Sequence, residues 1–156
     1  MELRLVRAGR EDAGLIWRMQ IEAFAKLYQT YQDTETSPAA EPIEKTAARL
    51  EDPFSYFYLI QSGSETVGAI RVIDKKEADI PKRISPLFIL PQFWNRGIAQ
   101  EAIRKAEQLH GRANWELDTI LQESGNCHLY EKMGYCPTGK TRVINEKLTL
   151  VFYRKD

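Results

Sequence analysis

The chain has 156 residues, a length that suits one domain with a sizeable core, and we expect residues 1–156 to form a single domain. Hydrophobic residues make up 43% and charged residues 28%, a globular balance that excludes intrinsic disorder. Lys plus Arg and Asp plus Glu both number 22, and no apolar run is long enough to span a membrane, so we expect neither a nucleic-acid nor a membrane partner.

The first third of the chain predicts one strand and two helices. Residues 2–7 place Leu3 and Leu5 on one face of an opening strand. Apolar side chains then recur at helical spacing, namely Leu15, Ile16, Met19, Ala23, Phe24 and Leu27. Residues 28–41 are mostly polar and are expected to form a loop or a broken helix. A second helix is expected to begin at Pro42 and to end before Pro53.

A β-hairpin is predicted next. Residues 55–61 are rich in strand-forming side chains, and residues 66–74 return as a second strand after the turn at 62–64. Residues 75–82 are charged and contain a proline, so they are expected to form an exposed connection.

A strand, a turn and a helix then form the central stretch of the sequence. Residues 87–90 are wholly apolar and are closed by Pro91, which suits a strand buried on both faces. The following helix is indicated by the apolar stripe Ile98, Ala99, Ala102, Ile103, Ala106 and Leu109. Gly111 is placed to end that helix.

The last third of the chain adds three strands and one helix. Residues 114–119 predict a strand, and residues 123–133 predict a helix that stops at Gly134. Residues 135–143 and 147–153 predict the final two strands. The order β-α-α-β-β-β-α-β-α-β-β indicates an α/β fold with a central mixed sheet and helices on both faces.

The turn before the central helix has the properties of an anion site. A helix start leaves backbone N–H groups unpaired, and its dipole attracts anions. Gly97 lets the backbone approach a bulky ligand, Arg96 adds a cation that pairs with phosphate oxygens, and Ala99 keeps the next position small. The pattern matches neither the P-loop nor the dinucleotide fingerprint. On local physics alone, an ordinary strand-to-helix connection is the favoured explanation.

The order of residues in this turn resembles a known motif. Pro91-Gln-Phe-Trp-Asn-Arg-Gly-Ile-Ala is similar to the acetyl-CoA-binding motif of the GNAT superfamily of N-acetyltransferases, Gln/Arg-x-x-Gly-x-Gly/Ala. Gly97 and Ala99 match, and Trp94 stands at the Gln/Arg position. Residues 129–135 read Leu-Tyr-Glu-Lys-Met-Gly-Tyr and resemble a second GNAT stretch, Leu-Tyr-Glu-Lys-x-Gly-Phe/Tyr. The resemblance therefore covers nearly the whole chain.

The resemblance implies a GNAT-like fold with a mixed, mostly antiparallel, seven-stranded sheet, and it implies acetyl-CoA as the cofactor. The cofactor-binding residues that it implies are Phe88, Ile89, Leu90, Trp94, Asn95, Arg96, Gly97, Ile98, Ala99 and Asn126. The backbone of residues 88–90 would pair with the pantetheine arm like an added strand, a role compatible with an ordinary core strand. Residues 96–99 would hold the pyrophosphate.

By the same resemblance, Tyr130 is the catalytic residue. Free phenol has a pKa of about 10 and free thiol about 8.5, so a tyrosine near the thioester sulfur is protonated at neutral pH and acts as a general acid. The alternative for Tyr130 is a core aromatic on an amphipathic helix. The family usually has an asparagine seven residues before this tyrosine. That position is Glu123, and Asn126 lies about one turn further on. Glu123 then either faces the substrate or stabilises the helix start through the dipole.

Several residues remain open candidates for other roles. The candidates for a general base are Glu116, Asp118 and Asp74, each of which also suits a solvated surface position, and none is selected. Cys127 and Cys136 form no disulfide framework, and neither resembles an acyl-carrying nucleophile. No metal is expected, because neither histidine stands at metal-ligand spacing.

The acceptor is expected to bind between residues 24–42 and the connection at 75–82. Phe24, Tyr28 and Tyr31, with the acidic residues that follow, suit a small amine, although they would also serve to cover the sheet. We therefore expect a cytoplasmic enzyme that moves an acetyl group directly to a small primary amine. Dimers are common among the enzymes it resembles, so a homodimer is one expected assembly. The alternatives for the function are acetylation of a protein or peptide amine, and a regulatory domain that binds acyl-CoA without catalysis.

Overall fold

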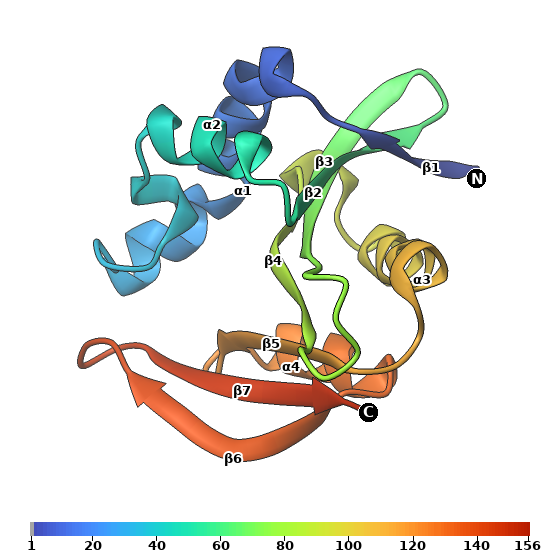
Figure 1. The fold of residues 1–156 in the computed structure, drawn as a ribbon. Helices are drawn as coiled ribbons and strands as arrows, with labels where there is room; N and C mark the ends of the chain where they lie inside the picture. The colour runs from blue at the N-terminus through green and yellow to red at the C-terminus, as the bar shows by residue number, and fades with distance from the viewer. Residues whose placement is uncertain (1) are drawn as a thin grey trace.

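The computed structural model describes residues 2–156, which form a twisted sheet with helices on both faces (Figure 1). The strands are β1 (Leu3–Arg7), β2 (Ser55–Ser62), β3 (Glu65–Ile73), β4 (Lys82–Ile89), β5 (Trp115–Ile120), β6 (Cys136–Val143) and β7 (Thr149–Lys155). The α-helices are α1 (Ala13–Tyr31), α2 (Ile43–Glu51), α3 (Ile98–His110) and α4 (Ser124–Lys132). Short 3-10 turns occur at Arg10–Asp12, Pro38–Ala40 and Pro91–Phe93.

The seven strands lie in the order β1-β2-β3-β4-β5-β7-β6. Every neighbouring pair is antiparallel except β4 and β5, which run parallel and follow one another through the crossover helix α3. The element order and the mostly antiparallel, seven-stranded sheet confirm the fold class predicted from the sequence.

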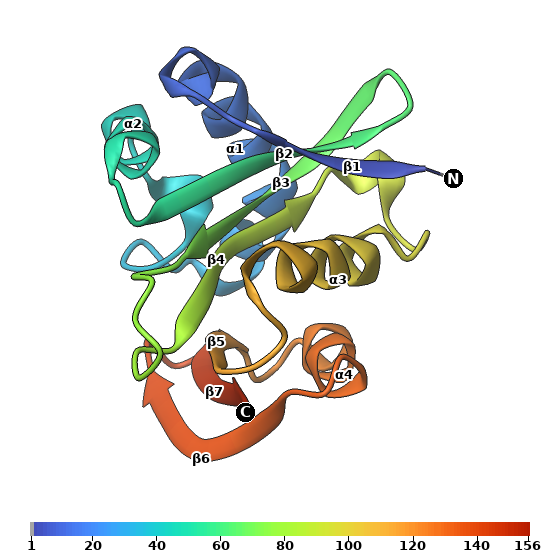
Figure 2. The same ribbon diagram turned by 45° about the vertical axis from the view of Figure 1, so that its right-hand side comes forward.

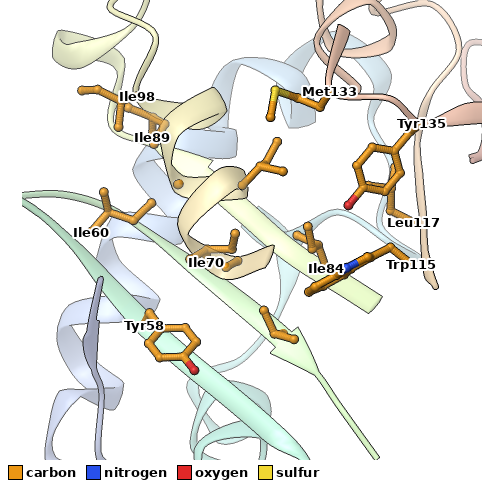
Figure 3. Packing of buried hydrophobic residues seen from close by; sticks show 14 of the residues in the cluster. Tyr58, Ile60, Ile70, Ile84, Ile89, Ile98, Trp115, Leu117, Met133 and Tyr135 are labelled. Atoms are coloured by element: carbon orange, nitrogen blue, oxygen red, sulfur yellow. The ribbon is translucent and has the colours of Figure 1, made fainter. Parts of the chain in front are cut away.

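The sheet has α1 and α2 on one side and α3 and α4 on the other (Figure 2), and it separates two hydrophobic layers. Because side chains alternate between the faces of a strand, neighbouring residues of β2 enter different layers. Phe57 and Leu59 pack in the layer that contains α1 residues, whereas Tyr58 and Ile60 pack in the layer that contains α3 residues. The α3 layer also takes in Trp115 of β5, and extends to side chains at the end of α4 (Figure 3). The strands at the centre of the sheet are thus buried on both faces.

Helix α1 is longer than expected. It continues to Tyr31 and includes residues 28–31, which were expected to be a loop or a broken helix. Gln32 ends it in the left-handed conformation (φ 52°), and its N–H bonds to the carbonyl of Tyr28. Tyr31 is buried against Leu148 and Leu150, so tertiary packing prolongs the helix through a polar stretch of sequence.

Strand β4 begins earlier than expected, at Lys82 rather than at residue 87. Ile84 pairs with Val72 of β3, and Lys82 pairs with Trp115 of β5. Pro86 alone would argue against a strand here, because proline cannot donate a backbone hydrogen bond. It falls at an irregularity in the pairing with β3, and pairing with β3 and β5 on either side of β4 keeps the segment in the sheet. Among residues 2–156, no helix is long and apolar enough to cross a membrane.

Candidate active site

A cleft opens where β4 and β5 part. The two strands pair only at Lys82 with Trp115 and at Arg83 with Glu116, whereas β4 stays paired to β3 as far as Ile89. Most of β4 therefore lacks a partner on its β5 side. A cleft of about 730 Å³ lies there, with walls from α1 and the segment after it, β4, the start of α3, β5 and α4.

The backbone of β4 presents hydrogen-bonding groups to this cleft at alternate residues. The N–H of Leu90 bonds to the carbonyl of Val67 on β3 at 2.8 Å. Because successive residues of a strand direct their backbone groups to opposite sides, Ile89 and Leu87 face the gap. The indole N–H of Trp94 donates to the Ile89 carbonyl at 2.7 Å, which shows that this carbonyl points away from β3.

The turn before α3 forms one end of the cleft. Gly97 adopts the left-handed conformation (φ 75°), and a Cβ placed there would meet no atom within 4 Å. The first helical bond runs from the N–H of Glu101 to the Gly97 carbonyl, so the N–H groups of residues 98–100 have no partner within the helix. The Arg96 guanidinium lies 5.5 Å from the ring centre of Phe93. Open space, free N–H groups and a cation together fit a diphosphate.

Nearly all of the predicted cofactor residues line this one cleft. They are Phe88, Ile89, Trp94, Asn95, Arg96, Gly97, Ile98, Ala99 and Asn126. The exception is Leu90, whose side chain is buried in the layer beneath α1. Leu87 also lines the cleft, although neither motif in the sequence selects it. Leu87 could have been identified from the alternation of backbone groups along β4, but only once the pairing of β4 with β3 was known.

Tyr130 enters the same cleft from α4. Its ring packs edge-on against Tyr135 and at a tilt against Tyr153, with centroids 6.0 and 6.4 Å away. Burial, and secondarily the nearby charge of Asp118, raise the pKa of the Tyr130 phenol well above its usual value of 10. The hydroxyl has no hydrogen-bond partner within residues 2–156. It is a protonated, unengaged donor that faces a space shared with Arg96.

The three residues proposed for acceptor binding take different positions. Phe24 lines the cleft and packs edge-on against Phe88 at 5.8 Å. Tyr28 does not line it. Tyr31 lies behind the wall, where its hydroxyl donates to Glu123 at 2.5 Å. That hydrogen bond, followed by burial and the charge of Glu123, raises the pKa of Tyr31 to about 12.

The three base candidates are also separated by the fold. Asp118 lines the cleft, but it forms an ion pair with Arg83. Glu116 lies outside the cleft, 4.0 Å from the same arginine. Asp74 lies in another part of the molecule, where it accepts a hydrogen bond from His110 at 2.8 Å. Among residues 2–156, no three potential metal ligands lie close enough to form a metal site.

Glu123 stands immediately before α4 and lines the cleft. Its side chain caps no N–H of the helix, although its carbonyl accepts bonds from Asn126 and Cys127. The side chain instead accepts a hydrogen bond from the Tyr31 hydroxyl. Its spacing of about two helical turns before Tyr130 is the sequence signal that places both on one side of α4.

Proteins of known structure share this fold. Structures with a similar fold include an acetyltransferase from Thermus thermophilus, with a TM-score of 0.71, 19% identity, and coverage of 98% of this chain and 96% of that one. A spermidine N-acetyltransferase from Vibrio cholerae in complex with CoA and spermine has a TM-score of 0.76 at 16% identity. The match covers 97% of this chain and 93% of that one. The ribosomal-protein-S18-alanine N-acetyltransferase of Escherichia coli has a TM-score of 0.74 at 9% identity. The match covers 97% of this chain and 92% of that one.

No curated protein matches this chain by sequence. The sequence model of the acetyltransferase (GNAT) family matches residues 19–135, well over half of the chain. This match confirms the resemblance seen in the two motifs. The chain belongs to the acetyltransferase (GNAT) family.

Proposed function

We propose that this protein is an acetyl-CoA-dependent N-acetyltransferase that acts on a small primary amine. One observation carries the proposal: the Arg96–Gly97 turn and the Tyr130 hydroxyl, about 30 residues apart in sequence, open into a single cleft. A phosphate cradle at one end and a phenol along the wall suit a long carrier that ends in a thioester.

The residues present fit such a carrier along its whole length. The N–H groups at the start of α3 and the Arg96 guanidinium would hold the diphosphate. The gap-facing backbone of Ile89 and Leu87 would bond to the amide groups of the pantetheine arm, as an added strand does. The similar structure from Vibrio cholerae contains CoA, which supports this assignment.

Tyr130 would assist departure of the thiol. Acetyl-CoA supplies an acetyl carbon that an amine attacks, with the CoA sulfur as the leaving group. Tyr130 donates its proton toward the sulfur, and its raised pKa keeps that proton on the phenol until the step occurs. Cys127 does not line the cleft, and its Sγ lies near the carbonyls of Ile120 and Leu121, which supports direct transfer without an acyl-enzyme.

The acceptor end of the cleft favours a small molecule. Helix α1 and the segment at 33–38 enclose it opposite β4, with Phe24 and Phe88 in edge contact on its wall. A folded protein substrate would have to reach past this segment. The similar structures include enzymes named for a small amine and for a ribosomal protein, so the acceptor has to be tested directly.

An amine panel tests the proposal. Purified protein is mixed with acetyl-CoA and with phenethylamine, spermidine or a peptide that begins with alanine, and thiol release is followed. We expect release with a small amine and none with the peptide. Release with the peptide alone would shift the proposal to protein acetylation. If CoA raises the melting temperature while every amine is silent, the regulatory alternative gains.

A further inference from the structure

The cleft carries five charged side chains, and three of them are carboxylates. They are Lys26, Asp33, Arg96, Asp118 and Glu123. Arg96 belongs to the phosphate end. The partners of the other four within the protein decide which of them is left to attract a ligand.

Two of the three carboxylates are already engaged. Asp33 is buried and closes its own loop, where it accepts bonds from the N–H groups of Glu35 and Thr36 and from the Thr36 hydroxyl. Asp118 is neutralised by the guanidinium of Arg83. The charge of Asp118 is therefore compensated by a cation, and both oxygens of Asp33 are occupied by neutral donors of its own loop.

Glu123 differs from both. The only hydrogen bond to its side chain comes from the Tyr31 phenol, to Oε2, and no Lys, Arg or His nitrogen within residues 2–156 lies within 4 Å of it. A phenol that stays protonated to high pH holds the carboxylate in place without cancelling its charge. Within the same residues, Oε1 has no protein partner. Among the described cleft residues, Glu123 is therefore the carboxylate that has no cation partner and also an oxygen, Oε1, that accepts no hydrogen bond.

The rest of the cleft lining is largely apolar and includes a further positive charge. Its apolar side chains include Phe24, Leu27, Leu87, Ile120, Leu148 and Leu150. Lys26, exposed and without an ion pair among the described residues, lines the cleft from α1. A second ammonium on the ligand would find no other carboxylate among the described cleft residues that has both an uncompensated charge and an unbonded oxygen, and the cleft lining includes the positive charge of Lys26.

We propose that Glu123, held by Tyr31, binds the ammonium of the acceptor and takes its proton, and that it selects a monocationic primary amine with an apolar body over a polyamine. This inference rests on the proposed function and adds the identity of the base and the class of acceptor. It makes Glu123, rather than Asp118, Glu116 or Asp74, the group that prepares the nucleophile.

Each proton in the reaction has a donor and an acceptor. Glu123 removes one proton from the ammonium, and the neutral nitrogen forms a bond to the acetyl carbon. Tyr130 gives its proton to the sulfur as the carbon–sulfur bond breaks. The phenolate recovers a proton from the nitrogen that becomes the amide. Glu123 then releases its proton to solvent, so one proton leaves for each amide and thiol formed.

Binding to the CoA-loaded protein tests the selection without turnover. Phenethylamine and spermidine are each titrated by calorimetry into wild-type protein saturated with CoA. We expect phenethylamine to bind at least about tenfold more tightly, because a further ammonium of spermidine would lose the equivalent of one charged hydrogen bond. Glu123→Gln should lose about tenfold or more of this affinity. The matched control is Glu131→Gln. Glu131 lies in α4 and, like Glu123, accepts a hydrogen bond from a tyrosine hydroxyl, that of Tyr153 at 2.8 Å, but it does not line the cleft. The affinity of this control should stay at the wild-type value.

A second readout follows the rate against pH with phenethylamine and acetyl-CoA. The other ionisable groups that line the cleft or bond to its carboxylates are Lys26, Tyr31, Asp33, Arg83, Arg96, Asp118 and Tyr130. Without a base, only the free amine in solution reacts, so kcat/KM of Glu123→Gln should be lowest at neutral pH and should approach wild type as pH rises. Tyr31→Phe, which keeps the carboxylate but frees it, should weaken amine binding by a few-fold, about the size of one hydrogen bond.

The outcomes separate this inference from the proposed function. If wild-type protein does not bind CoA, the acetyltransferase proposal fails first. If CoA binds and Glu123→Gln still takes phenethylamine with wild-type affinity, the role of Glu123 is wrong. Tighter binding of spermidine than of phenethylamine, or no binding of either, overturns the acceptor class. If circular dichroism shows that Glu123→Gln is misfolded, Tyr31→Phe and the wild type provide the test. Wild-type amine affinity in Tyr31→Phe, together with a kcat/KM of the wild type that does not change with pH, would overturn the proposed role of Glu123 and Tyr31.

Discussion

At the scale of single residues, the Tyr130 hydroxyl is a donor for which the described protein provides no acceptor. A buried phenol that only packs would be as stable, or more so, without its oxygen, whereas a general acid cannot lose it. We expect Tyr130→Phe to lower kcat by about tenfold or more, because positioned proton transfer is typically worth about 10²–10⁴-fold. The melting-temperature rise caused by CoA should persist. Unchanged kcat would reduce Tyr130 to a packing residue beside Tyr135 and Tyr153.

Gly97 provides the residue-scale test of the phosphate cradle. Gly97→Glu adds bulk and negative charge where the open space and free N–H groups lie, so we expect it to abolish the CoA-induced rise in melting temperature. The substitution also strains a left-handed backbone, at a cost of about 1–2 kcal/mol. Gly63 in the β2–β3 turn matches that strain, with φ 62° and nothing within 4 Å, yet it lies outside the cleft. Gly63→Glu should therefore keep the full response, and loss of the response in both variants would contradict the assignment.

At the scale of elements, a buried hydrogen-bond chain fixes the C-terminal end of α3. The His110 side chain is 3% exposed, its Nδ1–H donates to Asp74 at 2.8 Å, and its Nε2 accepts from the Tyr58 hydroxyl at 2.7 Å. Burial lowers the pKa of His110, with help from Lys76 and Lys82, against the opposing effect of Asp74. Burial alone would raise the pKa of Asp74, but hydrogen bonds from His110 and Lys76 outweigh it and leave that pKa lowered.

These directions predict how stability depends on pH. Because the folded pKa of His110 is below that of the unfolded chain, about 6.5, the unfolded state takes up the proton first as pH falls, and stability is lost. The lowered pKa of Asp74 acts in the same direction at lower pH. We expect the free energy of unfolding in urea to fall between about pH 7.5 and pH 5.5, by about 1.4 kcal/mol for each unit of difference in the His110 pKa. His110→Gln should flatten this slope, and His128→Gln, on an exposed α4 position, should not.

At the scale of the whole molecule, the separation of β4 from β5 leaves a slot in an otherwise continuous sheet. If CoA fills the slot as a strand would, amide hydrogen exchange should slow at Ile89 and Leu87, which face the gap, by about tenfold at saturating CoA. Phe88 and Leu90 serve as internal controls, because their N–H groups face β3. Equal slowing at all four amides, measured by NMR, would indicate general stabilisation and would contradict the strand-like contact.

Much of this architecture can be read from residues that are close in sequence. The apolar stripe of α3, the alternation of the hairpin strands and the glycine stops depend on periods of two or 3.6 residues, so they are visible locally. The two errors, the extent of α1 and the start of β4, lie where packing or pairing with a remote segment overrides local polarity. Tyr31 extends α1 because it packs on β7, and Lys82 belongs to a strand because β5 pairs with it.

The sequence by itself determined the order of elements, the family, and two motifs at a spacing that predicts a shared cleft. Only the tertiary structure decided which charged groups remain free in that cleft. Tyr31 meets Glu123 across 92 residues, and Arg83 meets Asp118 across 35. Such contacts depend on strand order and register, which bring distant residues together without any local pattern. The charge available to a substrate is what remains after those contacts form.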